Sequence, residues 1–377
     1  MNNHDMRVFV IADDLTGACD VGVQFAACSP AAIVWLDWGS AVPATDDVAI
    51  FTTESRNLQP AEAAAAVSRV CEVFSPTARQ LIYKKIDSTM RGNIGTELSA
   101  AMSTCRRTRA VVCPAFPQMK RVVEDGRLRV LEASAIEVDI ARQLRDQGVA
   151  GVRQLPLSEF EGADLDEGIT IVDASTDSDL DRIASCALAL EPPLLFCGSA
   201  GLARALASRL GPVGNASSAS VVSAGAAAVL LIMGTTHPAT QEQLQYFIRA
   251  AGAARVEPMA PLPQIRSAVE SGTDVVIDLN WDRMERRGFT QWCHDLLQMT
   301  AAPLFVSGGD TVSLVCDILQ VKGIRLRSEI LPGIPYGVLM GGPAEGKIIV
   351  TKSGGFGERD AIMRAVTVVK RAAKRQP

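Results

Sequence analysis

The sequence contains few of the residues that hold zinc or build disulfide frameworks. Its 377 residues include nine cysteines, an odd number, and none of them has the CxxC spacing of a zinc site. The three histidines, His4, His237 and His294, are too dispersed to suggest a histidine metal cluster. These absences exclude a cysteine-based zinc site and indicate reduced thiols in the core of a cytoplasmic protein. Any metal is then expected to be a hard, oxygen-bound ion such as Mg²⁺.

The chain also lacks a basic tract, and it is poor in aromatic residues and in long apolar runs. Lysine and arginine number 37 against 42 acidic residues, which gives a net charge of −5, and aromatic residues make up 5%. This balance argues against a nucleic-acid partner and favours small ligands. The longest apolar run, Ala226–Met233, is far shorter than the roughly 18 to 20 residues of a membrane helix, and no signal peptide is recognisable. We expect a cytoplasmic protein without a membrane partner, and the sequence is compatible with a homo-oligomer.

The common fingerprints of phosphate-handling loops are missing. No GxGxxG string opens a strand–helix unit, which argues against a nicotinamide enzyme. The string Gly341–Lys347 has the form GxxxxGK, but Ile348 follows where a phosphate loop needs serine or threonine, and an apolar strand comes next instead of a helix. A DxDxT phosphatase motif fails at Ala12, which stands where its nucleophilic aspartate belongs. These three enzyme classes are therefore unsupported.

What the sequence does contain is a regular alternation of short apolar runs with segments of helical periodicity. Val8–Ala12 has the composition of a buried strand, Pro60–Val73 has helical spacing, and Val122–Leu131 resembles a small hairpin. The alternation predicts an α/β fold with mainly parallel sheets. A stretch rich in glycine, serine and alanine at 211–225 predicts a linker between domains at 1–210 and 226–377. The active site is expected in the cleft between the two domains.

Polar residues follow two predicted strands of the first domain. Asp13, Asp14 and Thr16 come directly after Val8–Ala12, where ligands collect in open α/β sheets. These carboxylates can hold substrate hydroxyls, accept a proton or bind Mg²⁺ through water. The ordinary alternative is a helix N-cap, although two adjacent carboxylates exceed what a cap requires.

The second polar cluster lies at the end of the predicted strand Leu81–Ile86 and consists of Lys84, Lys85, Asp87, Ser88 and Arg91. An arginine fork suits a carboxylate, and a lysine acts as a point charge toward phosphate or carboxylate. Side chains alternate along a strand, so only one of the two lysines is expected to face the site, and Lys85 shares its face with Asp87. The alternative is a solvated turn with an aspartate–arginine pair.

Three turns in the second domain follow a strand, contain glycine or hydroxyl residues, and precede a helix: Gly234–Thr236, Ser307–Thr311 and Ser353–Gly357. Glycine lets the backbone approach a phosphate closely, and the free N–H groups of a helix start attract anions. A single turn of this kind is an ordinary connection in α/β folds. Three in one domain favour a nucleotide-phosphate site.

The motifs IADDLTGACD, KKIDSTMRGN, CGSAGLA, SGGDT and KSGGFGERD, in this order and spacing, resemble those of the four-carbon acid sugar kinases, formerly a domain of unknown function. The resemblance covers nearly the whole chain. It implies that the N-terminal domain binds the sugar acid and the C-terminal domain binds ATP. The implied products are the 4-phosphates of threonate, erythronate or 3-oxo-tetronate.

The resemblance also implies roles for individual residues. The implied sugar-acid contacts are Asp13, Asp14, Lys85, Asp87 and Arg91, and the implied nucleotide contacts are Gly234, Thr235, Gly308, Gly309, Asp310, Thr311, Gly354 and Gly355. Two segments depart from the family pattern. The chain has GTTH in place of a GSxS-type turn, and PAFPQMKR in place of PAxPxxGR, so that Met119 and Lys120 take the glycine and arginine positions unless the local register is shifted. The second departure bears on substrate identity.

The resulting hypothesis is an ATP- and Mg²⁺-dependent kinase that phosphorylates the terminal hydroxyl of a small sugar acid. Arg91, with Lys85, is expected to hold the substrate carboxylate. The expected catalytic residues are Asp13 and Asp14, one of which orients the attacking hydroxyl or takes its proton, with Asp310 as another candidate base or metal ligand. Two alternatives stay open: an aldolase or isomerase acting on a phosphorylated sugar acid, and a sugar-acid sensor without turnover.

Overall fold

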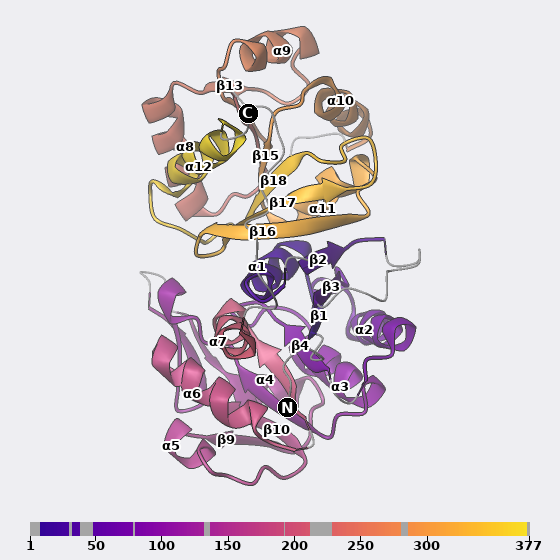
Figure 1. Cartoon of the computed structure of the whole chain (residues 1–377), viewed down its shortest axis with the longest axis vertical. Coiled ribbons are helices and arrows are strands. Elements are labelled where there is room, and N and C mark those ends of the chain that lie inside the picture. The colour runs from indigo at the N-terminus through magenta and orange to yellow at the C-terminus, as the bar shows by residue number, and fades with distance from the viewer. Residues whose placement is uncertain are drawn as a thin grey trace. The chain divides into compact units, whose positions relative to one another are not determined.

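The computed structural model describes residues 8–29, 32–37, 48–77, 80–131, 136–191, 193–211, 228–279 and 286–374, and the chain forms two compact units (Figure 1). The first unit comprises Met1–Val34 and Pro43–Ala216, and the second comprises Trp35–Val42 and Ser217–Pro377. Each is an α/β structure in which parallel strands predominate, which confirms the predicted fold class. Residues 212–225 of the predicted linker lie outside the described residues. No described helix is both long and apolar enough to cross a membrane.

The strands of the first unit follow the order β2–β3–β1–β4–β11–β5–β10–β9, and those from β3 to β9 pair in parallel. Their bounds are Val8–Ala12 (β1), Ala32–Trp35 (β2), Val48–Thr52 (β3), Leu81–Lys85 (β4), Arg109–Cys113 (β5), Val152–Leu155 (β9), Gly168–Val172 (β10) and Leu195–Gly198 (β11). Strands β1, β4, β5 and β11 are buried along their whole length, as expected when helices cover both faces of a parallel sheet.

Helices pack on both faces of these strands. Helix α1 (Leu15–Ala26) contacts α7 (Ala200–Leu210), and α2 (Pro60–Phe74) contacts α3 (Ile94–Thr104). The remaining helices of the unit are η2 (Pro117–Met119), α4 (Ile140–Asp146), α5 (Leu157–Phe160) and α6 (Asp177–Leu188). Strands β6 (Arg121–Glu124), β7 (Arg127–Val130) and β8 (Glu137–Asp139) form a separate antiparallel sheet, and its first two strands confirm the hairpin predicted over Val122–Leu131.

The CGSAGLA motif has a packing explanation in this unit. A Cβ atom at Gly198 would lie 2.4 Å from the carbonyl oxygen of Cys113, and one at Gly201 would lie 2.4 Å from that of Ala115. The start of α7 therefore packs directly on the backbone that follows β5. Ser199 caps this helix and donates a hydrogen bond to the Ala115 carbonyl. Close packing alone accounts for both glycines.

The second unit has the strand order β13–β14–β12–β15–β18–β17–β16. The first five strands are parallel, β17 is antiparallel to β18, and β16 is antiparallel to β17. Their bounds are Leu230–Met233 (β12), Ala254–Val256 (β13), Val275–Asp278 (β14), Leu304–Ser307 (β15), Gly323–Leu331 (β16), Ile334–Met340 (β17) and Ile348–Lys352 (β18). The three turns singled out in the sequence thus follow the neighbouring strands β12, β15 and β18.

The helices of this unit are α8 (Pro238–Ala251), α9 (Leu262–Glu270), α10 (Arg286–Met299), α11 (Gly309–Ile318) and α12 (Ala361–Lys374). Helices α8 and α12 lie side by side over the strands (Figure 1). Their core contains Met233, Phe247, Phe305 and Ile362, all with at most 1% of their surface exposed. This packing fixes α8 and α12 relative to the parallel strands.

Candidate active site

In the first unit, Arg56 lies at the centre of the predicted polar cluster. It follows β3, the strand that pairs with β1. Its guanidinium donates bonds of 2.7 and 2.9 Å to Asp13 and of 2.6 and 2.9 Å to Asp14, so that both oxygens of both carboxylates accept. It also approaches Asp87 to 3.7 Å, an ion-pair distance. Arg56 therefore connects the polar turn after β1 with the polar turn after β4.

Asp14 has a second structural role as the N-cap of α1. It accepts hydrogen bonds from the N–H of Gly17 at 3.0 Å and from the hydroxyl of Thr16 at 2.6 Å. The helix-cap alternative is thus correct for Asp14, but it does not account for the bonds to Arg56. Asp13 takes no part in the cap and is only 2% exposed.

Asp87 is held by the turn that follows β4. It accepts bonds of 2.9 and 2.7 Å from the Arg91 guanidinium and a bond of 2.5 Å from the hydroxyl of Thr89. The Arg91 side chain is 69% exposed, whereas that of Asp87 is 9% exposed. Arg91 therefore covers Asp87 from the solvent side and keeps part of its own fork accessible.

The two lysines of β4 face opposite sides of the sheet. Lys84 is fully buried and forms a 2.7 Å ion pair with Glu97 of α3. Lys85 lies on the α1 side, where a Cβ atom at Gly17 would be only 2.7 Å from its ammonium. Within the part of the chain that the structure describes, no acceptor lies within hydrogen-bond distance of the Lys85 ammonium, although the residue is 3% exposed. A buried ammonium that makes no hydrogen bond is a strong candidate for binding an anionic ligand.

The electrostatics of this cluster keep its carboxylates ionised. Burial alone would raise the pKa of Asp14, but the charges of Arg56 and Lys85 and the Thr16 hydroxyl hold it below its ordinary value. The pKa of Asp87 is likewise lowered: burial opposes the shift, and the hydrogen bond from Arg91 and the charge of Arg56 outweigh it. The pKa of Arg56 is raised because the nearby carboxylates outweigh its burial. Three carboxylates thus share one partly buried arginine.

In the second unit, the three glycine-rich turns meet at the carboxyl ends of β12, β15 and β18. The N–H of Gly234 donates to the Ser307 carbonyl at 3.0 Å, and the N–H of Gly308 donates to the Lys352 carbonyl at 3.1 Å. A Cβ atom at Gly354 would lie 2.6 Å from the hydroxyl of Thr235. The turns are therefore in direct contact, and larger side chains would separate them.

The other predicted nucleotide contacts lie around these turns. Gly309, Asp310 and Thr311 form the first turn of α11, where Asp310 is exposed and Thr311 is buried. The Thr311 hydroxyl has no hydrogen-bond partner within the described residues. Gly355 lies next to His237, the N-cap of α8, whose Nε2 atom is 3.3 Å from the position of a Cβ atom on that glycine.

The structure changes the interpretation of the segment PAFPQMKR. Lys120 is exposed and adopts a left-handed backbone with φ of 59°, a conformation that favours glycine. This indicates that Lys120 takes the glycine position of the family pattern and Arg121 takes the arginine position, so assigning these positions to Met119 and Lys120 is wrong. Arg121 is 4% exposed and donates to the Met119 carbonyl. Within this segment the departure from the family pattern is thus the replacement at Lys120.

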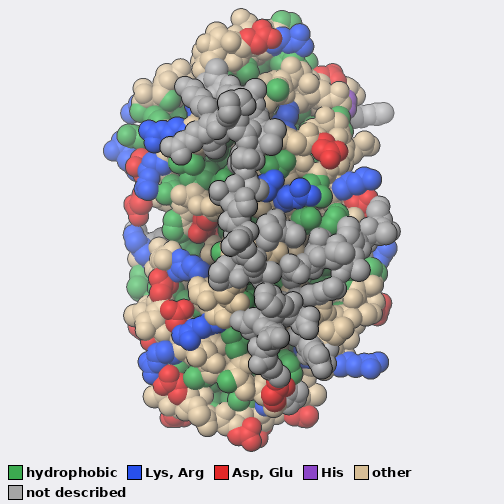
Figure 2. All heavy atoms as spheres, viewed as in Figure 1, with side chains coloured by type: hydrophobic (Ala, Val, Ile, Leu, Met, Phe, Trp, Pro, Cys, Tyr) green, Lys and Arg blue, Asp and Glu red, His purple; other side chains and the backbone are tan. Residues whose placement is uncertain are grey.

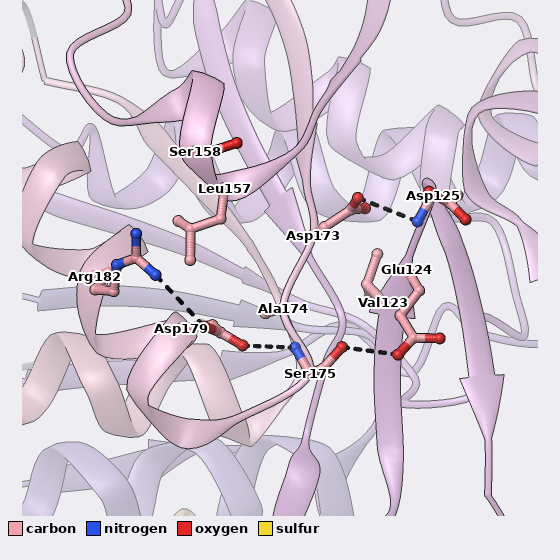
Figure 3. Close-up of a pocket in the computed structure, with 10 residues that line it drawn as sticks. All are labelled: Val123, Glu124, Asp125, Leu157, Ser158, Asp173, Ala174, Ser175, Asp179 and Arg182. Atoms are coloured by element: carbon pink, nitrogen blue, oxygen red, sulfur yellow. Dashed lines mark hydrogen bonds and ion pairs between the residues drawn. The ribbon is translucent and has the colours of Figure 1, made fainter.

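A shallow pocket of about 370 Å³ lies elsewhere in the first unit, near the end of β10 (Figure 3). Its acidic side chains are already engaged: Asp173 accepts from the backbone of Asp125 and Gly126, and Asp179 accepts from the backbone of Ser175. None of the residues that line it belongs to the Arg56 cluster. We assign it no function. On the face shown in Figure 2, basic and acidic side chains are interspersed, as the balanced composition implies.

Comparison with known proteins also divides the chain into an N-terminal and a C-terminal part. A family described as the sugar-binding N-terminal domain matches residues 8–144 and 133–206, and one described as the nucleotide-binding C-terminal domain matches 278–362. A D-threonate kinase of Bordetella bronchiseptica is 32% identical over 404 residues, which cover 96% of this chain and 97% of that protein. The chain belongs to the four-carbon acid sugar kinase family.

Other four-carbon acid sugar kinases are similar over the same length. A D-erythronate kinase of Heliobacterium modesticaldum is 27% identical, with 96% of each chain covered. The crystal structure of a Haemophilus influenzae protein, assigned to a domain-of-unknown-function family, superposes with a TM-score of 0.67 at 18% identity and covers 96% of this chain and 100% of that one. The likeness to this structure shows a common fold.

Within this four-carbon acid sugar kinase, sequence reasoning missed two residues that organise the predicted clusters. Arg56 lies in the stretch TTESRN, where a lone arginine near a glutamate gives no signal of its own. Its position after the strand next to β1 becomes informative only once the strand order is known. Lys352 ends the apolar run IIVTK and is only 1% exposed. Its burial could not be anticipated, because a lysine at a strand end is usually solvated.

Proposed function

We propose that this protein transfers the terminal phosphoryl group of ATP to the 4-hydroxyl of a four-carbon sugar acid such as threonate, erythronate or 3-oxo-tetronate. The observation that carries the proposal is the convergence of three glycine-rich turns at neighbouring strand ends in the unit that contains the nucleotide-binding match. Such turns present backbone N–H groups to phosphate. The relatives supply the substrate class, since their names specify threonate and erythronate.

On the sugar-acid side, Lys85 is the group best suited to the substrate carboxylate. Its ammonium is almost entirely buried and bonds to no described acceptor, so an incoming carboxylate gives it the partner that it lacks. Arg91 is the second candidate, because its exposed fork uses only part of its donors on Asp87. The substrate hydroxyls can donate to oxygens of Asp13, Asp14 and Asp87, each of which has lone pairs beyond those used by arginine.

We assign Asp13 and Asp14 to the attacking hydroxyl. Both are fixed by Arg56, and the lowered pKa of Asp14 makes it a weak base at neutral pH. Phosphoryl transfer depends mainly on positioning and charge neutralisation, so a carboxylate that orients the hydroxyl is sufficient. Asp13 takes no part in the helix cap, so its lone pairs are engaged less than those of Asp14 and it is the better candidate of the two.

On the nucleotide side, Gly234, Thr235, Gly308 and Gly354 are proposed to surround the phosphates. Gly354 offers a backbone N–H and Thr235 a hydroxyl, whereas Gly234 and Gly308, whose N–H groups bond to the neighbouring strand ends, let the backbone approach closely. Mg²⁺ commonly keeps several waters and takes one or two carboxylates in addition to phosphate oxygens. The exposed Asp310 is the carboxylate that could hold the ion, and the ion would neutralise phosphate charge.

The test is a coupled assay of ADP release with ATP, Mg²⁺ and each stereoisomer of threonate and erythronate, together with 3-oxo-tetronate. We expect turnover with at least one acid. Phosphorus NMR should then show a product phosphorylated on the hydroxyl group of its terminal carbon. A thermal-shift titration with ATP–Mg²⁺ should stabilise the protein. Stabilisation by a sugar phosphate but not by ATP would point to an aldolase or isomerase. Binding of an acid without ADP release would point to a sensor.

The proposal places the protein in the cytoplasm, where ATP is available and thiols stay reduced. All nine cysteines are free thiols, and eight of them are buried.

A further inference from the structure

A buried lysine lies beneath the last of the three glycine-rich turns. Lys352 ends β18, and its ammonium donates to the hydroxyl of Thr240 at 2.7 Å, to the Ser353 carbonyl at 3.0 Å and to the Gly354 carbonyl at 3.5 Å. Thr240, which is fully buried in α8, donates its own hydroxyl to the Gly354 carbonyl at 2.5 Å. No described carboxylate lies within ion-pair distance of this ammonium. The Lys352 ammonium therefore binds the carbonyl groups of the turn and is not part of an ion pair.

These bonds determine which way the peptide groups of the turn point. In a trans peptide unit the C=O and the N–H point in opposite directions. The carbonyls of Ser353 and Gly354 point inward, toward Lys352 and Thr240, so the N–H groups of Gly354 and Gly355 point outward. Neither N–H donates to any residue that the structure describes. Two successive outward N–H groups form the kind of concavity that binds phosphate oxygens.

We propose that Lys352 and Thr240 are positioning residues that orient the N–H groups of Gly354 and Gly355 toward the phosphates of the bound nucleotide. The inference rests on the proposed kinase function and adds two residues that lie beneath the site without touching the ligand. The ammonium also places a positive charge below the turn, in a region where little water screens it. Nucleotide affinity should therefore depend on this charge.

The protonation of Lys352 gives this arrangement a second signature. Burial lowers the pKa of Lys352 to about 7, and no neighbouring charge contributes to the shift. Titratable side chains on the neighbouring elements are His237 and Glu242 on α8, Asp310 on α11 and Arg359 before α12, and none of them hydrogen-bonds to the Lys352 ammonium. Loss of the proton removes one donor and the positive charge, so nucleotide affinity should fall as the pH rises above 7. The variant His237→Asn, which keeps an N-cap acceptor, should retain this pH dependence and so assign it to Lys352.

The decisive experiment compares two substitutions at Thr240 by isothermal titration with ATP and Mg²⁺. Thr240→Val keeps the shape of the side chain and removes the hydroxyl, and we expect the Kd for ATP to rise about tenfold. Thr240→Ser restores a hydroxyl and should bring the Kd back to within about threefold of wild type. Thr367→Val is the matched control, since Thr367 donates only to the Met363 carbonyl within α12. It should leave the Kd unchanged.

A second measurement distinguishes positioning from general destabilisation. In initial-rate kinetics, Thr240→Val should raise the KM for ATP and leave the KM for the sugar acid unchanged. Lys352→Met should raise the KM for ATP and abolish its pH dependence between pH 6.5 and 8.5. Should Lys352→Met fail to fold, the Thr240 pair decides the question.

The outcomes are separable. If wild type binds ATP and Thr240→Val binds it equally well, the positioning role is wrong. An equal rise in both KM values, accompanied by a lowered Tm, also overturns it, because that pattern shows a structural role only. If wild type itself does not bind ATP, the proposed function is wrong and the inference falls with it.

Discussion

The ion cluster around Arg56 should make the free energy of unfolding of the first unit depend on pH, and the substitution Arg56→Met should change that dependence. The Arg56 side chain is 16% exposed and bonds both oxygens of Asp13 and of Asp14. Methionine has a similar length and no charge, so Arg56→Met leaves two adjacent buried carboxylates without their main partner. Removing one member of a buried ion pair typically costs about 3 to 5 kcal/mol. We expect a loss of that size in the free energy of unfolding at pH 7.

The sign of the pH dependence follows from the pKa of Asp14, which lies below its ordinary value in the folded protein. A lowered carboxylate pKa stabilises the fold above the unfolded-state value of about 3.9, and this stabilisation is lost as the pH falls through the folded-state pKa. Without Arg56, burial dominates and the pKa of Asp14 rises. The carboxyl group of the variant then takes up a proton at a higher pH, which relieves the repulsion. The difference between wild type and variant should therefore be largest at pH 7 and smaller at pH 4.5.

Urea unfolding followed by circular dichroism at the two pH values measures this difference. Arg127→Met is the matched control, because it removes an arginine whose ion pair with Glu137 is exposed and should change stability little. An equal loss at pH 7 and pH 4.5 would refute the reasoning, since it would trace the effect to packing and not to charge. No loss at pH 7 would refute it as well.

Three further predictions concern the lysines of β4 and the turn after β18. Lys85→Met should raise the KM for the sugar acid at least about tenfold in initial-rate kinetics and leave the KM for ATP unchanged. Arg91→Ala, at a more exposed position, should raise the KM for the sugar acid by a smaller factor. A larger effect of Arg91→Ala than of Lys85→Met would contradict the assignment. Lys84→Met should lower the free energy of unfolding, measured in urea, by about 3 to 5 kcal/mol, because it leaves Glu97 buried without its cation. Adding Glu97→Met should recover much of this loss. A double variant less stable than Lys84→Met alone would show that the loss does not come from the unpaired carboxylate. Gly354→Ala should weaken ATP binding in titration calorimetry, because the added Cβ atom would lie 2.6 Å from a neighbouring hydroxyl; unchanged affinity would exclude this turn from the site.

Much of the fold could be predicted because its strands carry strong local signals. Runs such as Val8–Ala12 and Leu81–Lys85 are apolar and followed directly by polar turns, and the rule that ligands collect at the carboxyl ends of parallel strands grouped those turns correctly. The antiparallel strand Gly323–Leu331 was absent from the prediction. Its alternation of buried Ile324 and Leu326 with arginines was a usable signal of a half-exposed strand.

The centre of each candidate site could not be predicted, because it depends on contacts between distant segments. Arg56 reaches Asp13 only because β3 pairs with β1, and strand order is not encoded in local periodicity. Lys352 is buried because Thr240, 112 residues away, closes over it from α8. The predicted roles of individual residues in binding sugar acid and nucleotide stay predictions until the assays above are made.

The buried pair between Lys84 and Glu97 also protects the alignment of β4 during folding. Tyr83 packs edge-on against Phe25 of α1 at 6.1 Å between ring centroids, on the same face of the strand as Lys85. A slip of β4 by one residue in one direction would place Tyr83 opposite Glu97 and leave a carboxylate buried without a cation. A slip in the other direction would bring the Lys84 ammonium against the Phe25 ring. Each misalignment buries an uncompensated charge. The ion pair between Lys84 and Glu97 therefore favours one alignment of β4 with its neighbouring strands.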